Sequence, residues 1–135
     1  MRWVAFALTL VTGCSLTDLR EAVTEDMLEL SEEDKAELER LKVESAKVQM
    51  QNIKSALQLV ALKNRGKYPS TTDGLESVTQ YLANQTVPVD PWGNDYLYLS
   101  PATASTAKFD LISWGSDGKE GGTGSAADLS VWGSK

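Results

Sequence analysis

The fold is decided over residues 46–60, which read AKVQMQNIKSALQLV. Apolar side chains recur in this stretch at intervals of four, three, four and three positions. Such intervals line one face of an α-helix. The residues of this stripe are Ala46, Met50, Ile53, Leu57 and Val60. We predict that they form the core face of a long helix.

The predicted helix begins at Ser31 and ends before Gly66. Asp34 follows Ser31 by three residues, which resembles a capping box, and the acidic first turn suits the helix dipole. Lys63 and Arg65 place cations in the last turn, and Gly66 suits a left-handed cap. A helix of about 35 residues spans ~50 Å.

The first half of this helix is rich in Glu and Lys. We therefore expect it to protrude into solvent, with Glu37 and Glu44 exposed. A coiled coil is the alternative interpretation of so long a helix. Because the apolar stripe is dense only over the second half, we favour packing against one small domain.

The remainder of the chain indicates a small sheet. Residues 70–73 are expected to cap a second short helix, and residues 87–94 are rich in turn formers. Strands are predicted at residues 96–99 and 109–114, joined by a turn near residues 101–106. The second helix would bury Leu75, Val78 and Leu82. The predicted class is α+β: a long N-terminal helix packed on a small antiparallel sheet.

A glycine-rich acidic loop follows the second strand, over residues 115–129. So many glycines raise the entropy lost on ordering and leave few side chains to pack. Asp117 and Asp128 bracket the loop, and glycines let carbonyls turn inward, which suits a hard cation such as Ca²⁺. An EF-hand is excluded, because Lys119 and Gly121 stand where that loop needs oxygen ligands. An exposed Gly/Ser loop with incidental charges is the alternative.

The N-terminus predicts export and a lipid anchor. An apolar run over residues 3–11 follows the basic start and is shorter than the ~20 residues that span a bilayer. Residues 11–14 resemble the bacterial lipobox, so Cys14 is expected to be acylated and to anchor the mature chain to the membrane. Ser15 favours the outer membrane by resemblance to lipoprotein sorting. The alternative is an ordinary signal peptide with a stray cysteine.

These features divide the chain into three parts. Residues 1–13 are predicted to be a lipoprotein signal peptide, residues 14–30 a lipid anchor with an acidic tether, and residues 31–135 the folded domain. The formal net charge of −6 argues against binding to nucleic acid. A single cysteine cannot form an internal disulfide.

An enzyme is disfavoured by the same sequence. It has no histidine, and no nucleophile–base pair or convergent acid pair is apparent, so no small-molecule substrate is expected. Tryptophans can stack on carbohydrate, but we expect packing in the core and in turns. The residues concerned are Trp92, Trp114 and Trp132.

Five motifs occur in the order found in the major, G-type pseudopilin of type II secretion systems, which the last two-thirds of the chain resembles. They are Gly66-Lys67-Tyr68-Pro69, Thr71-Thr72-Asp73-Gly74-Leu75, Asp90-Pro91-Trp92-Gly93-Asn94, Phe109-Asp110-Leu111 and the segment 115–129. The resemblance implies a pseudopilin-like fold whose C-terminal loop binds Ca²⁺ through Asp117 and Asp128. It also implies secretion-machinery or pseudopilin partners.

The N-terminus departs from that family. Pseudopilins carry a short leader followed by a long apolar helix with a glutamate at its fifth position, whereas residues 2–14 contain no acid. Self-assembly into a filament is therefore expected to fail. We expect a lipid-anchored, pseudopilin-like structural or interaction protein of the envelope. The alternative is a freestanding calcium-dependent envelope lipoprotein, a sensor or surface module unrelated to secretion.

Overall fold

The computed structural model describes residues 30–103 and 105–133. Cys14 and the expectations for residues 1–29 lie outside the described residues. Contacts within the chain divide it into residues 1–35 and residues 36–135, and the second of these units holds the sheet and the core. Among the described residues, no helix combines the length and the apolar character that crossing a bilayer requires.

The long helix α2 runs over Glu32–Lys63, close to the predicted range. Its cap is as expected: the Asp34 backbone N–H donates to Ser31 Oγ at 3.1 Å, and that hydroxyl donates to the Asp34 carboxylate at 2.7 Å. At the other end Gly66 is left-handed, with φ of 84°, and its N–H donates to Ala61 O at 2.7 Å. These contacts satisfy backbone groups that helix ends leave unpaired.

The predicted apolar stripe is the core face of α2. All five of its members are buried, and Ala56 and Ala61 extend the stripe on either side. Glu37 and Glu44 are exposed, as expected. The helix therefore packs on one small domain through its second half, which confirms the preferred interpretation.

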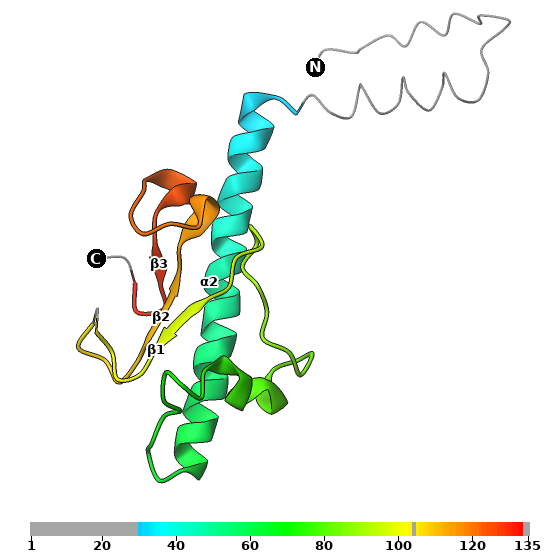
Figure 1. Cartoon of the computed structure of the whole chain (residues 1–135). Coiled ribbons are helices and arrows are strands. Elements are labelled where there is room, and N and C mark those ends of the chain that lie inside the picture. Colours follow the sequence, from blue (N-terminus) through cyan, green and yellow to red (C-terminus); the bar gives the residue numbers. More distant parts are fainter. Residues whose placement is uncertain (1–29, 104, 134–135) are drawn as a thin grey trace, which may run out of the picture. The chain divides into compact units, whose positions relative to one another are not determined.

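Within the described residues the sheet is antiparallel and has three strands in the order β1-β2-β3 (Figure 1). β1 (Leu97–Leu99) pairs with β2 (Asp110–Ser113), and β2 pairs with β3 (Leu129–Ser130). The first two strands were predicted. The third was missed, because a two-residue strand carries no readable alternation and its pairing depends on β2. The architecture is the predicted α+β class.

The second helix differs from the prediction. η1 (Leu75–Tyr81) is a 3₁₀-helix, and its first turn has no side-chain cap. Ser70 and Asp73 instead bond each other across a preceding turn, since the Asp73 N–H donates to Ser70 Oγ and the Ser70 N–H donates to the Asp73 carboxylate. Leu75, Val78 and Leu82 are buried as expected. The apolar pattern was correct, but the cap was not.

Aromatic packing around Phe109 holds Trp132 in place. Phe109 is fully buried, with Tyr68, Tyr98 and Trp132 around it at ring-centroid distances of 5.0, 5.8 and 5.2 Å. Trp132 Nε1 donates to Phe109 O at 2.8 Å, and Lys54 Nζ of α2 lies 4.1 Å from a Trp132 ring centroid. Trp132 is thereby held against both the strand segment and the helix.

Candidate metal centre

The glycine-rich loop joins β2 to β3 and contains two single 3₁₀ turns, η2 (Gly115–Asp117) and η3 (Gly124–Ala126). Because Ser113 of β2 lies opposite Leu129 of β3, the loop leaves and re-enters the sheet at the same end of these two strands. In Figure 1 it is the orange-to-red arch beside α2. The two segments that carry Asp117 and Asp128 therefore start from the same end of the sheet.

Each of the two predicted ligands accepts a hydrogen bond from a backbone N–H of the loop through one carboxylate oxygen. Asp117 is exposed, and its Oδ1 accepts from the Lys119 N–H at 3.1 Å. Asp128 is half-buried, and its Oδ2 accepts from the Gly121 N–H at 3.0 Å. Asp128 Oδ1 is buried and has no hydrogen-bond partner among the described residues. A buried carboxylate oxygen without a donor is unfavourable unless a cation or water meets it.

The donor set suits calcium better than a transition metal. No group of three or more His, Cys, Asp or Glu side chains able to hold a metal occurs within residues 30–103 and 105–133. Two carboxylates supplemented by backbone carbonyls match the oxygen shell of Ca²⁺. The unpaired Oδ1 of Asp128 is the structural observation that fits such an ion.

Close backbone contact between η2 and η3 gives the loop its shape. Gly115 has φ of 65°, and a Cβ there would lie 2.6 Å from Ser125 O and 2.9 Å from Ala127 O. A Cβ on Gly121, by contrast, would meet no atom within 4 Å. Glycine is thus required at position 115 for two reasons: the backbone is left-handed there, and residues 125–127 approach too closely to leave room for a side chain.

The turn at residues 90–94, which contacts this loop, is held together by a buried aspartate. Asp90 is 2% exposed, and its Oδ1 accepts from the N–H groups of Trp92 and Asn94 at 3.1 and 2.7 Å. Its Oδ2 accepts from the Ser113 hydroxyl of β2 at 2.8 Å. One carboxylate therefore closes the turn and fixes it to the last residue of the strand that enters the loop.

Two further side chains tie the turn to its surroundings. Asn94 Nδ2 donates to Gly115 O at 3.3 Å, which reaches the first residue of the loop. Trp92 Nε1 donates to Glu39 Oε2 at 2.8 Å, and Lys42 donates to Glu39 Oε1 at 2.9 Å. The turn thus connects the loop to the first half of α2.

Glu39 is held in its charged form by these donors. The hydrogen bond from Trp92 lowers the pKa of its carboxyl most, followed by the hydrogen bond from Lys42, and the Ser125 hydroxyl of η3 acts in the same direction. Desolvation opposes them, since burial favours the neutral acid. The helix and the turn consequently meet at one carboxylate.

Sequence reasoning identified this turn but missed what it does. Asp90 was assigned to a turn alone, although an aspartate followed by accessible N–H groups two and four residues later is a readable Asx pattern. Glu39 carried no such signal, because it is one of many acids on a charged helix. Its partner Trp92 lies far away in the sequence.

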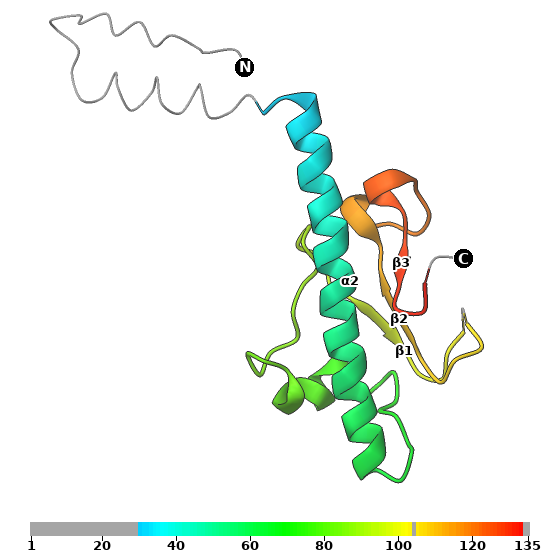
Figure 2. The same ribbon diagram turned by 180° about the vertical axis from the view of Figure 1, so that it is seen from behind.

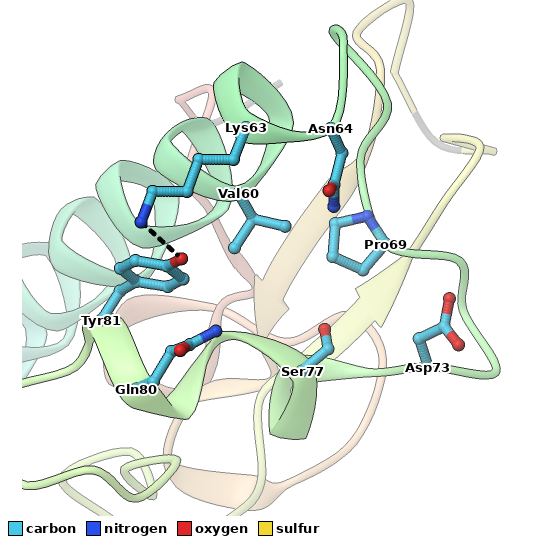
Figure 3. A pocket seen from close by; sticks show the side chains of 8 residues that line it. All are labelled: Val60, Lys63, Asn64, Pro69, Asp73, Ser77, Gln80 and Tyr81. Atoms are coloured by element: carbon cyan, nitrogen blue, oxygen red, sulfur yellow. Dashed lines mark hydrogen bonds between the residues drawn. The ribbon is translucent and has the colours of Figure 1, made fainter.

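A separate cavity of about 350 Å³ lies between the end of α2 and η1 (Figure 3). Lys63 Nζ reaches over the ring of Tyr81 and donates to its hydroxyl at 2.9 Å. The rest of the lining mixes amides, hydroxyls, a carboxylate and apolar groups. It comprises Val60, Asn64, Pro69, Asp73, Ser77 and Gln80. No nucleophile–base pair occurs among these lining side chains.

Comparison with known proteins gives a consistent result. A sequence model of the family described as type II secretion system protein G matches residues 35–132. The chain is 40% identical over 109 residues to the type II secretion system core protein G of Pseudomonas aeruginosa, covering 70% of this chain and 73% of that protein. The core protein G of Vibrio cholerae is 38% identical over 92 residues, with 59% and 61% covered. That of Escherichia coli K12 is 34% identical over 94 residues, with 60% and 61% covered.

Proposed function

The chain belongs to the type II secretion system protein G family, and from that premise we propose that it is a lipid-anchored, pseudopilin-like structural protein of the bacterial envelope. It would dock on type II secretion or related pilus-like machinery. The observation that carries this proposal is the family match over residues 35–132, which includes the helix, the sheet and the glycine-rich loop. A fold alone would not be enough, since one fold serves many functions.

The role proposed is structural rather than catalytic. In the described residues the buried Asp90 accepts a hydrogen bond from Ser113 of β2, and Glu39 of α2 accepts one from Trp92, so both carboxylates connect parts of the fold. In the cavity beside η1, Lys63 Nζ donates a hydrogen bond to the hydroxyl of Tyr81. These arrangements support rigidity, which is what a component of an assembly requires.

Calcium is the proposed ligand of the loop. Asp117 and Asp128 would supply carboxylate oxygens, and loop carbonyls would complete the shell. The buried Oδ1 of Asp128 supports this assignment, because a cation would compensate it. When bound, the ion would neutralise the charges of the two aspartates and hold the loop at the end of β2 and β3.

Cys14 is the proposed anchor. The lipobox-like sequence of residues 11–14 supports acylation at this cysteine. Each buried CH₂ of an acyl chain contributes about 0.8 kcal/mol, so more than one chain would give a durable anchor. The domain would then face the periplasm or the surface from the membrane to which it is attached, with the outer membrane favoured by Ser15.

Chemical crosslinking in the native envelope tests the docking. We expect secretion-apparatus proteins among the crosslinked partners of the wild type. Recovery of none of them would contradict the proposal and favour a freestanding envelope lipoprotein. In parallel, Cys14→Ser should move the chain into the soluble fraction. A variant that stays on membranes through detergent-free washing would place the anchor elsewhere and leave the docking result standing.

A further inference from the structure

Asn94 closes a ring of hydrogen bonds between the turn at residues 90–94 and the glycine-rich loop. Its backbone N–H donates to Asp90 Oδ1 at 2.7 Å, and Asp90 Oδ2 accepts from the Ser113 hydroxyl at 2.8 Å. Ser113 Oγ also accepts from the Gly115 N–H at 3.3 Å. Gly115 O then accepts from Asn94 Nδ2 at 3.3 Å. The side chain of Asn94 is the link that reaches a carbonyl of the loop.

The part of this ring that holds Asn94 is buried. Asp90 is 2% exposed and Ser113 is fully buried. The Asp90 N–H donates to Asn94 O at 2.8 Å, so the backbone of Asn94 is held at both its N–H and its carbonyl. Buried polar groups whose hydrogen bonds are satisfied make their surroundings rigid. Asn94 therefore reaches the loop from a fixed position.

The Asn94 amide lies across the turn that carries Asp117. In Figure 2, η2 is one of the two short orange coils of the loop. Gly115 begins η2, and the left-handed Gly118 ends it with an N–H that donates to Gly115 O at 3.4 Å. A Cβ on Gly118 would lie 3.1 Å from Asn94 Oδ1. One side chain thus contacts both ends of η2, and Asp117 lies between these contacts.

We propose that Asn94 is a positioning residue for the calcium site: it orders η2 before the ion binds and thereby raises the calcium affinity at Asp117. The inference rests on calcium as the proposed ligand of the loop. Ordering a glycine-rich segment costs much entropy, and an ion that must order the segment binds more weakly by that cost. Asn94 removes this cost for η2 and leaves residues 119–128 for the ion to order.

A side chain that only stabilised the fold would behave differently. Its hydrogen bond would contribute equally with and without the ion, so its removal would lower the melting temperature and leave the calcium dissociation constant unchanged. A positioning residue changes the dissociation constant, because its removal loosens the metal-free turn more than the calcium-bound one.

Calorimetric titration of the purified full chain with Ca²⁺ measures this constant. Asn94→Ala removes the amide but keeps the backbone bonds to Asp90, and it should weaken calcium binding about fivefold, as expected for one hydrogen bond. Trp92→Phe is the matched control, because it removes the hydrogen bond from the same turn to Glu39 and should leave the constant unchanged.

Two results of this titration would overturn the role of Asn94 alone. One is an equal dissociation constant for the wild type and Asn94→Ala, and the other is equal weakening in Trp92→Phe. A wild type that takes up no Ca²⁺ would instead contradict calcium as the ligand of the loop, and this inference with it.

Backbone order parameters from NMR of the metal-free protein give a readout that does not depend on affinity. Asn94→Ala should lower the order parameters of residues 115–118, saturating Ca²⁺ should restore them, and Trp92→Phe should leave them unchanged. Asn94→Ser, whose side chain is too short to span η2, provides the same comparison if the alanine variant does not fold. Unchanged order parameters in the Asn94 variants would overturn the proposal.

Discussion

The core and the glycine-rich loop are stabilised by different forces. The core joins α2 to the sheet through fully buried apolar side chains such as Leu57 and Phe109. In the two turns of the loop, Gly115 is the one buried residue, and order comes from carboxylates, amides and close backbone contact. Burial of apolar area needs no ligand, whereas a loop of this kind gains from one. The core should therefore pack without calcium, whereas the order of the loop should depend on it.

The largest expected effect comes from a cavity in the core. Leu57→Ala should lower the free energy of unfolding by about 2–5 kcal/mol, because the side chain is fully buried between helix and sheet. Leu62→Ala, measured in dilute protein, is the control on the exposed face of the same helix and should change little. Denaturant titration compares the two. A loss below half a kcal/mol for Leu57→Ala would mean that this face is not the core.

Calcium should stabilise the loop by a smaller amount. At a hundredfold excess over the dissociation constant, binding to the folded state alone adds about 2.7 kcal/mol. Asp117→Ala should remove most of this increment and leave the metal-free stability nearly unchanged, and Mg²⁺ should substitute poorly. Thermal melts with millimolar Ca²⁺ and with chelator measure it. Coincident wild-type curves would leave the loop without its proposed ligand.

The core variant sharpens the same comparison. Leu57→Ala should show the wild-type calcium increment, since sites without shared partners contribute additively. Loss of the increment in this variant would mean that the cavity in the core disturbs the calcium site of the loop.

Two glycines of the loop separate backbone strain from close packing. Both Gly115 and Gly121 have positive φ, at 65° and 93°, but only Gly115 faces backbone atoms at short range. Alanine at either position costs about 1–2 kcal/mol for the left-handed conformation. Gly115→Ala should lose about 1–3 kcal/mol more, because η3 must move. Equal losses in denaturant titrations would contradict the contact between η2 and η3.

The smallest effect concerns acid sensitivity at Glu39, where α2 meets the turn that contains Trp92. Its folded-state pKa is lowered from the ordinary value of 4.5, chiefly by the hydrogen bond from Trp92. A lowered pKa contributes stability above the unfolded value, and this contribution is lost as pH falls through the folded value. The contribution is small, because the side chain is 34% exposed and solvent screens it.

Glu39→Gln should therefore reduce the difference in melting temperature between about pH 7 and about pH 3. Glu33→Gln, on the exposed first turn of α2, is the control and should leave that difference unchanged. Equal changes in both variants would mean that the Trp92 contact does not tune this carboxyl.

The sequence predicts what depends on local patterns and misses what depends on distant partners. The stripe from Ala46 to Val60 fixed the helix and its buried face, because helical periodicity is written into neighbouring residues. β3 has only two residues and exists because β2 is beside it. Asp128 could be proposed as a ligand from its place in the loop, but burial of its Oδ1 required coordinates.

The contact between Gln51 and Val131 has a consequence for how the molecule folds. Gln51 Nε2 of α2 donates to Val131 O at 3.4 Å, across 80 residues of sequence, and Val131 is buried in the same core. Bringing together two residues so far apart in the sequence costs conformational entropy before their contacts form, and this slows folding. The helix can form as soon as it is synthesised, but its core face is covered completely only once Val131 has emerged. Premature termination near residue 128 would therefore leave an apolar helix face open to aggregation.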